Sequence, residues 1–381
     1  MSPTSKNLPP CDRPAASPEA EGLEAWAGRR VAVALSGGVD SAVAAHGLVA
    51  AGADVIGLSL RLHDPDPDNP LAPRACCPPD DLQDARRIAE GLDIPFYVLD
   101  GRRAFDEAVV RPFVRAYVSG RTPNPCVGCN AFVKLEQLHR RAKALGCEAL
   151  ATGHYARKKD GRLLQAVDGK KDQSYFLFSV GPQILADLIF PLGSMRKEEV
   201  REAAVQTGLP VAHKLESQEV CFVGGAGAGG FVKRQPEAQG DHAGAIVDER
   251  GRELGRHAGI MNFTVGQRRG IGIAAESPLH VLRILPETKQ VVVGPAQSLA
   301  AHWLRAERVT WTRSVAPVEP FEALVQIRYR DPGTPATVHP MPEGAEVRFG
   351  QAVRAVAPGQ ATVFRVGEEV VGGGWIAEGG T

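Results

Sequence analysis

The sequence lacks several features that would place it in a membrane, secreted or histone-like class. No run of about 18 apolar residues occurs in its 381 residues, so we expect no membrane-spanning helix. Lys and Arg together number 44, as do Asp and Glu, so the chain has no net charge. That balance argues against a uniformly basic nucleic-acid binder but is compatible with a local basic face. The start has no basic stretch followed by an apolar one, so we predict a disordered extension over residues 1–28 rather than a secretory signal.

Cysteines are also scarce. The seven are too few and too unevenly spread for a disulfide scaffold, and without a signal they indicate the reducing cytoplasm. Cys126 and Cys129 form a C-x-x-C pair, compatible with metal binding, redox exchange or a single nucleophile. The adjacent Cys76 and Cys77 would be poor tetrahedral partners for that pair, so a structural zinc site is disfavoured, and we assign these two no role.

What is present is the composition of a globular protein, with 44% hydrophobic and 23% charged residues. Between Arg29 and Leu209 short apolar runs alternate with helical stretches, which predicts a parallel sheet with crossover helices. The expected strands are Val31–Leu35, Val55–Leu60, Phe96–Leu99 and Glu148–Thr152, and the expected helices are Asp40–Ala51, Asp81–Gly91 and Ala104–Ser119. Ligands of such sheets bind at the carboxyl ends of the strands.

A glycine-rich stretch, Gly224–Gly230, divides the chain. Five glycines in seven residues predict a flexible connector rather than a helix or strand. Beyond it, short apolar runs separated by Gly, Pro or Asp predict one or two small β barrels or sandwiches. We therefore expect an α/β domain at 29–223, a connector at 224–240, a central β domain at 241–300 and a C-terminal β-barrel at 301–378.

The segment Ser36–Ser41, which reads SGGVDS, directly follows the first predicted strand and opens a helix. Glycines allow close backbone approach, and the N–H groups of the loop and the helix N-terminus favour an anion, so we predict a phosphate site. The loop lacks the Gly-Lys-Ser/Thr ending of kinases and GTPases and the G-x-G-x-x-G of dinucleotide dehydrogenases. It resembles the SGGxDS signature of the PP-loop ATP pyrophosphatases, which split ATP into AMP and pyrophosphate and use the AMP to activate a carbonyl oxygen.

Two further cysteine contexts stand out. Cys126 and Cys129 lie in the segment Arg121–Asn130, where two prolines and an asparagine predict an extended loop. Cys221 lies among polar residues just before the glycine-rich stretch, which favours an exposed, movable thiol. A reactive thiol needs a cationic neighbour or a helix N-terminus, and Lys214 or His213 could supply the charge.

Taken together, these motifs resemble the bacterial tRNA-specific 2-thiouridylases, the MnmA family, from about Val31 to Ile376. The matching segments are SGGVDS at 36–41, RTPNPCVGCN at 121–130, ATGHYA at 151–156, KKDQSYFL at 170–177, SQEVCF at 217–222, TVGQRRGIGI at 264–273, RYR at 328–330, APGQATVF at 357–364 and GGGWI at 372–376. The resemblance implies a PP-loop domain followed by a small central β domain and a C-terminal β-barrel.

The resemblance implies an enzyme that replaces the C2 oxygen of the wobble uridine in lysine, glutamate and glutamine tRNAs by sulfur. ATP, with Mg²⁺, would adenylate that oxygen, because AMP is a far better leaving group than hydroxide. By motif match Cys221 would carry the sulfur as a persulfide. Cys129, the second catalytic thiol, would either attack the activated carbon or reduce the persulfide, leaving a Cys129–Cys221 disulfide. The implied partners are the tRNA anticodon stem-loop and a sulfur donor, either a cysteine desulfurase or a relay protein, with no membrane involved.

The family's other contacts carry over by position. The implied ATP contacts are Ala34, Leu35, Ser36, Gly37, Gly38, Val39, Asp40, Ser41, Leu60 and Gly153. The implied tRNA contacts are Asn124, Pro125 and Cys126 at the flipped base, and His154, Lys171, Asp172, Gln173, Arg328, Tyr329 and Gln360 elsewhere. Chemistry on a base requires taking it out of the stack, which costs little in a single-stranded anticodon loop.

The sequence departs from the family at Cys126 and Glu216, where many members carry Asp, and in the density of glycine at Gly224–Gly230. Cys126, Cys129 and Cys221 could instead ligate three irons of a [4Fe–4S] cluster, which we hold as a minority hypothesis. No other metal site is expected.

Two other function classes remain as alternatives. The first is another PP-loop enzyme, such as an amide-forming synthetase or a thiolase acting on a different tRNA base. No glutaminase segment supports the synthetase, and other tRNA thiolases do not share the β half with its GQRRGIGI motif. The second is a non-catalytic RNA-binding module with a relict loop, against which the intact SGGVDS and the two matched cysteines argue.

Overall fold

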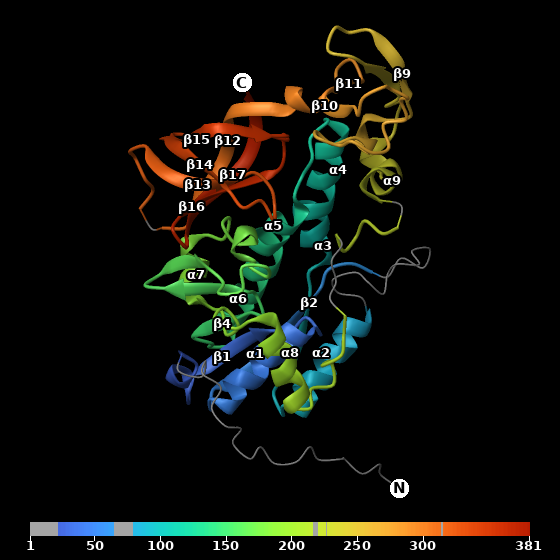
Figure 1. The fold of residues 1–381 in the computed structure, drawn as a ribbon. Coiled ribbons are helices and arrows are strands. Elements are labelled where there is room, and N and C mark those ends of the chain that lie inside the picture. The colour runs from blue at the N-terminus through green and yellow to red at the C-terminus, as the bar shows by residue number, and fades with distance from the viewer. Residues whose placement is uncertain (1–21, 65–78, 216–219, 226, 314) are drawn as a thin grey trace.

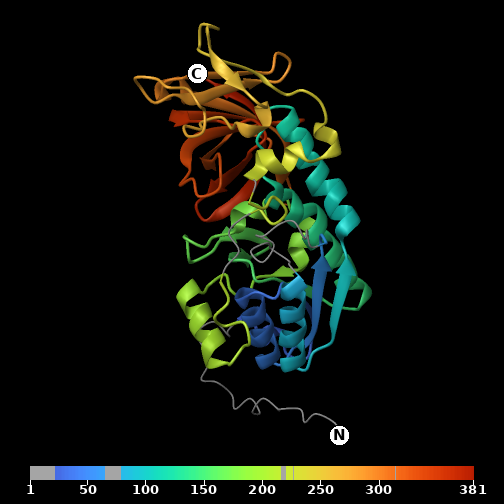
Figure 2. The same ribbon diagram turned by 90° about the vertical axis from the view of Figure 1, so that its right-hand side faces the viewer.

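The computed structural model describes residues 22–64, 79–215, 220–225, 227–313 and 315–381. Cys76, Cys77 and Glu216, named above, lie outside the described residues. The molecule has an α/β part at one end and two β parts side by side at the other, and both views show this division (Figures 1 and 2). No helix within the described ranges is long and apolar enough to cross a membrane.

The α/β part is built on a five-stranded parallel sheet of order β3-β2-β1-β4-β7. Its strands are β1 (Arg30–Ala34), β2 (Asp54–Arg61), β3 (Phe96–Asp100), β4 (Ala149–Ala151) and β7 (Leu188–Ile189). Helices α1 (Val39–Ala50), α2 (Pro79–Gly91), α6 (Glu136–Ala144) and α8 (Lys197–Gln206) accompany it. This confirms the predicted parallel sheet. The strand order reverses between β1 and β4, so a ligand crevice is expected where these two strands end.

A broken helical rod runs from the sheet toward the β parts and is visible as α3 and α4 in Figure 1. It consists of α3 (Arg102–Phe105), the π-helix η4 (Asp106–Val110) and α4 (Arg111–Val118). A second rod joins α5 (Pro125–Cys129), the π-helix η5 (Asn130–Leu135) and α6. The expected extended loop over Arg121–Asn130 is therefore wrong beyond Asn124. Proline favours the first position of a helix, and Pro125 starts α5 there.

The central β part is a four-stranded sheet of order β10-β11-β8-β9. Its strands are β8 (Gly244–Val247), β9 (Glu253–His257), β10 (His280–Leu285) and β11 (Gln290–Gly294). The chain enters it through helix α9 (Gly227–Lys233), where the sequence predicted no helix. Val232 is buried, and Phe231 packs with it against α4, so tertiary packing outweighs the low helix propensity of glycine. At Gly229 a side chain would meet the side chain of Asn262, which would have to shift, so the glycine favours this close packing.

The C-terminal part is a closed six-stranded barrel. Strands β12 (Ala300–Trp311), β13 (Phe321–Gln326), β14 (Thr334–Met341), β15 (Gly344–Arg354), β16 (Ala361–Val366) and β17 (Glu369–Gly380) form it in the order β12-β15-β14-β13-β16-β17. Pairing of β12 with β17 closes it. A hairpin of the α/β part, β5 (Ala156–Lys159) and β6 (Arg162–Gln165), extends the same sheet at β17, which the sequence did not predict.

Short helices complete the described elements: η2 (Glu24–Trp26), η6 (Ser174–Phe176), α7 (Pro182–Asp187), η7 (Pro236–Ala238), η8 (Ile260–Asn262) and η9 (Ala296–Leu299). The first of them corrects the expected disorder of residues 22–28. Leu23 and Trp26 pack against the sheet core, which holds this segment in place.

One apolar cluster joins the α/β part to the barrel. It contains buried residues of the sheet and of the second rod, such as Leu58 and Val133, together with Val363 and Val370 of the barrel. Arg121 forms an ion pair with Glu307 of β12 at 2.8 Å across the same boundary. The two parts therefore share a core.

Candidate active site

The phosphate loop lies between β1 and α1, as predicted. The hydroxyl of Ser41 donates to the carbonyl of Gly38 at 3.1 Å and accepts from the backbone N–H of Ser36 at 3.2 Å, so it closes the loop on itself. Gly37 has a φ of +74°, and a side chain there would collide with the backbone of Asp81 at the start of α2. Glycine at position 37 therefore lets the loop lie directly against the start of α2.

Lys214 holds this loop against α2, which the sequence did not predict. Its ammonium donates to the carbonyl of Gly37 at 2.9 Å and to the carboxylates of Asp81 and Asp84 at 2.5 and 2.6 Å. Desolvation alone would lower the pKa of Lys214, but the hydrogen bonds from the two aspartates outweigh it and raise the pKa. Lys214 therefore stays charged and contacts the phosphate loop.

Asp40, the acidic residue of the loop motif, is held by a second lysine. Lys197, only 5% exposed, donates to its carboxylate at 2.7 Å, and the hydroxyl of Tyr155 donates to the same oxygen at 2.9 Å. Since Tyr155 follows β4 and Lys197 begins α8, Asp40 ties three elements together around the helix N-terminus.

The end of β4 meets the phosphate loop directly. At Gly153 a side chain would lie 2.8 Å from the backbone nitrogen of Ser41, so the glycine lets β4 approach α1. Gly153 therefore lies beside the loop, and its contact with ATP stays a prediction. His154 follows and shares a hydrogen bond of 2.9 Å with Thr152. Its side chain is partly exposed, yet desolvation, together with the charge of Lys134, lowers its pKa to about 4, so it is neutral at pH 7.

The two cysteines assigned catalytic roles contact the same apolar cluster. Cys129 ends α5 and is 6% exposed within it, and Cys221 is partly buried and packs against it. Phe222, next to Cys221, stands edge-on to Phe105 and Phe113 with ring centroids 5.6 and 5.0 Å apart. Cys126 is exposed on the same short helix as Cys129.

Several predicted tRNA contacts gather around Tyr175. Its buried hydroxyl donates to the carbonyl of Ala361 at 2.9 Å and also bonds the side chain of Asn124. Tyr329 packs against its ring at 5.7 Å, and Gln360 adjoins Ala361 at the start of β16. Strand β13 ends at Gln326, and Tyr329 lies in the turn that follows.

Lys171, Asp172 and Gln173 directly precede η6, the short helix that carries Tyr175. Asp172 accepts hydrogen bonds from the backbone N–H groups of Ala166 and Ser174 at 3.0 and 3.2 Å, which shapes the turn. The side chain of Gln173 accepts from the backbone of Tyr155 at 3.0 Å. Asp172 and Gln173 thus serve the fold, and their contact with RNA stays a prediction. Leu60 is a buried residue of β2, 5% exposed.

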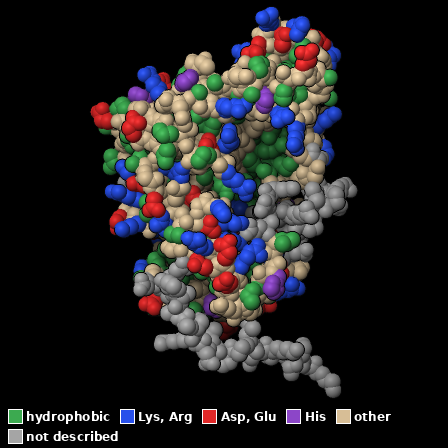
Figure 3. Space-filling view, viewed as in Figure 1, with side chains coloured by type: hydrophobic (Ala, Val, Ile, Leu, Met, Phe, Trp, Pro, Cys, Tyr) green, Lys and Arg blue, Asp and Glu red, His purple; other side chains and the backbone are tan. Residues whose placement is uncertain are grey.

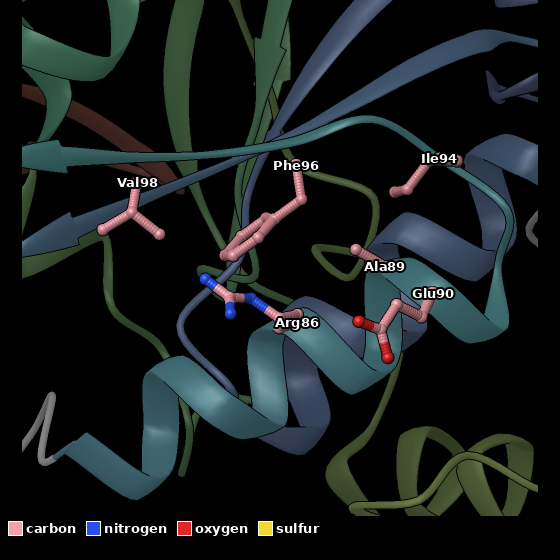
Figure 4. Close-up of a pocket in the computed structure, with 6 residues that line it drawn as sticks. All are labelled: Arg86, Ala89, Glu90, Ile94, Phe96 and Val98. Carbon is pink, nitrogen blue, oxygen red and sulfur yellow. The ribbon is translucent and has the colours of Figure 1, made fainter.

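The molecule has a hollow on one face and a separate small pocket. Figure 3 shows a hollow beside α4 with hydrophobic side chains on its floor and Lys and Arg side chains at its rim. Another pocket, of about 360 Å³, lies between α2 and β3 and contains none of the predicted site residues (Figure 4). Its lining is Arg86, Ala89, Glu90, Ile94, Phe96 and Val98.

A metal cluster on the cysteines is not supported. Within the part of the chain that the structure describes, no group of three His, Cys, Asp or Glu side chains is arranged to hold a metal ion. Cys126 is exposed, Cys129 is buried and Cys221 is partly buried. We derive no step through an iron–sulfur cluster.

Comparison with known proteins identifies the family. Residues 29–225 match the model of the tRNA methyl transferase HUP domain, 230–295 the tRNA methyl transferase PRC-barrel domain, and 301–376 the aminomethyltransferase beta-barrel domain. The tRNA-specific 2-thiouridylase MnmA of Magnetococcus marinus is 47% identical, covering 91% of this chain and 99% of its own. That of Geobacter metallireducens is 47% identical, covering 91% and 96%. The bifunctional protein NifU/MnmA of Rubrobacter xylanophilus is 46% identical, covering 94% and 72%. The chain belongs to the tRNA-specific 2-thiouridylase family.

Proposed function

We propose that this protein is an ATP-dependent tRNA 2-thiouridylase that converts the wobble uridine of lysine, glutamate and glutamine tRNAs to 2-thiouridine. One observation carries the proposal: Cys129 and Cys221, far apart in sequence, contact one apolar cluster in a domain that also holds a phosphate loop. The family membership supports the same activity. Methyl transfer, which the domain descriptions mention, would leave a loop of the ATP-splitting type without use.

In the first half of the proposed reaction, the triphosphate of ATP binds the loop Ser36–Ser41. The C2 oxygen of the extruded uridine attacks the α-phosphate, pyrophosphate leaves, and the oxygen is now part of an AMP leaving group. Mg²⁺ commonly binds through phosphates and only one or two carboxylates, so it would arrive with the nucleotide. Lys214 and Lys197 keep the carboxylates around the loop neutralised, which reduces their repulsion of the triphosphate.

In the second half, the terminal sulfur of a Cys221 persulfide is transferred to C2. In one route, the terminal sulfur attacks C2, and the Cys129 thiolate then attacks the sulfur of Cys221 and so releases the transferred sulfur. In the other, the Cys129 thiolate attacks Cys221 first and releases the terminal sulfur as hydrosulfide, which then attacks C2. Both routes expel AMP and leave a Cys129–Cys221 disulfide that an external thiol must reduce. In a third, the Cys129 thiolate first adds to C2 and expels AMP. The outer sulfur of the Cys221 persulfide then displaces Cys129 from C2, and the freed Cys129 thiolate attacks the sulfur of Cys221, which releases the thiolated base as the Cys129–Cys221 disulfide forms. Cys129 is buried in apolar surroundings, which keep water away from its own sulfur.

The test is product formation with single cysteine variants. The protein is incubated with Mg-ATP, unmodified lysine tRNA, cysteine and a cysteine desulfurase, and the digested RNA is analysed by mass spectrometry. We expect 2-thiouridine from the wild type and none from Cys129→Ala or Cys221→Ala. Cys147→Ala, which removes another buried thiol, should keep activity and serves as the matched control.

Other outcomes separate the alternatives. A methylated uridine would favour methyl transfer. tRNA-dependent AMP without thiouridine would keep the adenylation step and point to a different sulfur donor. Folded protein that gives neither product would contradict the proposed function and favour the RNA-binding module. Cys126→Ala shows whether that thiol takes part or only contacts the base. The donor, the tRNA preference and the cytoplasmic location stay predictions.

A further inference from the structure

Phe132 is an exposed aromatic residue on the helix that follows the candidate nucleophile. It lies in η5, and its side chain is 48% exposed, whereas Ala131, Val133 and Leu135 beside it are buried. A single exposed apolar side chain needs no special explanation. This ring, however, lies over the barrel residue Trp375, with centroids 6.4 Å apart and planes 21° apart.

An arginine completes the arrangement from the other side of the boundary. The guanidinium carbon of Arg308 lies 4.6 Å from the centroid of the Trp375 ring. Arg308 is exposed, and within the described residues no carboxylate lies within ion-pair distance of it. Trp375 itself is only 9% exposed, and both Phe132 and Arg308 pack on its ring.

The position of Arg308 depends on a β-bulge. In the β12–β17 pairing, Glu307 opposes Trp375 and Thr310 opposes Gly373. Two residues of β12, Arg308 and Val309, therefore stand opposite the single residue Gly374. Arg308 has a φ of +50°, which an arginine adopts only under constraint. A side chain at Gly374 would lie 2.8 Å from the carbonyl of Glu307, so the glycine permits the bulge. Bulges commonly re-aim a side chain, and this one directs Arg308 over the tryptophan.

The three residues adjoin the predicted tRNA contacts. Trp375 opposes Ala361 in the β16–β17 ladder, and Ala361 follows Gln360 directly. Glu307, next to Arg308, pairs with Arg121, which lies just before Asn124 in the chain. The aromatic and cationic side chains therefore lie along the boundary where the α/β part and the barrel would meet the RNA.

We propose that Phe132, Trp375 and Arg308 form a binding site for one unpaired nucleotide of the RNA substrate, adjacent to the base that is modified. The base stacks on the exposed ring of Phe132, and its phosphate pairs with Arg308. Proteins bind unpaired nucleotides in this way, with an aromatic platform for the base and a cation for the backbone. The inference rests on the proposed function, since it takes the substrate to be an anticodon loop.

The test measures binding of an unmodified anticodon stem-loop RNA by fluorescence anisotropy at several salt concentrations. Phe132→Leu keeps the apolar character but removes the ring, and we expect it to weaken binding roughly tenfold, within the range for one lost base stack. Phe132→Trp should bind like the wild type. Arg308→Gln should weaken binding and reduce the slope of log affinity against log salt by about 0.7–0.9, as for one lost phosphate contact.

A matched aromatic–arginine pair provides the control. Tyr97 on β3 is 40% exposed, with the guanidinium carbon of Arg141 5.6 Å from its ring centroid. Tyr97→Leu should leave RNA binding unchanged. Normal binding by Phe132→Leu would overturn the inference, because Phe132 would then only cover the boundary between the two parts. An equal loss of binding in Tyr97→Leu would overturn it as well.

The experiments distinguish a failure of this nucleotide-binding site from a failure of the proposed reaction. If the wild type forms 2-thiouridine but Phe132→Leu binds RNA normally, only the stacking site is wrong. If Phe132→Leu loses binding while the wild type binds RNA and forms no thiouridine, the site stands and the proposed reaction fails. A wild type that binds no anticodon stem-loop contradicts both.

Discussion

Single residues decide how the phosphate loop is held. Lys214 and Lys197 each place an ammonium beside the loop, and each is bound by carboxylates, Lys214 by Asp81 and Asp84 and Lys197 by Asp40. A bare carboxylate near a triphosphate would repel it, so these lysines matter for the nucleotide as well as for the fold. The chemistry of the loop is thus set by side chains from α2, from α8 and from the segment after α8.

We expect Lys214→Met to weaken ATP binding on the order of tenfold. The change leaves Asp81 and Asp84 uncompensated beside Gly37 and removes the bond to its carbonyl. Adding Asp84→Asn should restore part of the affinity by removing one of the repelling charges. The measurement is isothermal titration calorimetry with ATP.

The control for this prediction is Lys143→Met, which breaks a lysine–aspartate pair of 2.9 Å with Asp187 on α6 and α7. It should bind ATP normally. Unchanged affinity in Lys214→Met, or an equal loss in Lys143→Met, would show that Lys214 has no special connection with the nucleotide.

At the scale of elements, the site depends on close contacts between secondary structures. Gly37 lets α2 touch the loop, and Gly153 lets the end of β4 touch the start of α1. The π-helix η5 continues directly from α5, which carries Cys126 and Cys129. Such π-helical turns are frequent at functional sites, because they shift the side chains that follow.

We expect Gly153→Ala to impair ATP binding at least tenfold. Its methyl group would lie 2.8 Å from the nitrogen of Ser41 and 3.0 Å from the carbonyl carbon of Asp40, so β4 and α1 must separate. Overpacking of this kind also costs about 1–3 kcal/mol of stability. ATP binding and the thermal midpoint are measured together.

Gly181→Ala is the matched control, because its nearest contact is the end of the Gln183 side chain at 3.5 Å and its φ is −60°. That variant should behave like the wild type. Normal ATP binding by Gly153→Ala would show that β4 can move without affecting the loop.

At the scale of the molecule, the α/β part and the barrel are joined by three kinds of contact. They share an apolar cluster, the sheet that β5 and β6 extend, and the Arg121–Glu307 ion pair. The central sheet has an apolar cluster of its own, so it does not share the core that joins the α/β part to the barrel. This arrangement fixes the predicted base contact Asn124 relative to Gln360 on the barrel.

We expect Tyr175→Phe to lower the stability of both parts together. The change removes the donor to the buried Ala361 carbonyl, at a cost of about 1–2 kcal/mol, and also the bond to Asn124. Hydrogen exchange should show faster exchange in the sheet of the α/β part and in the barrel alike. Tyr117→Phe on α4, which loses a bond to Thr264, should affect the central part instead. A change confined to the barrel would contradict the shared core.

The sequence by itself determined the features that are local along the chain. The parallel strands, the loop between β1 and α1 and the β character of the second half each follow from short-range patterns of apolar, glycine and turn residues. The cysteines and the loop motif could be matched because they stand in contiguous segments. The helix at α9 was missed because its glycines disfavour a helix locally, and only the packing of Phe231 and Val232 compensates.

Tertiary structure decided everything that depends on residues meeting through space. The contact of Lys214 with Gly37, the bond from Tyr175 to Ala361 and the pairing of β6 with β17 all join positions distant in sequence. No local pattern encodes such contacts, because the free energy of a buried hydrogen bond or ion pair depends on which partner the fold brings to it. The residues of the reaction can thus be found from motifs, but the side chains that hold them in place are determined by the packing of the chain.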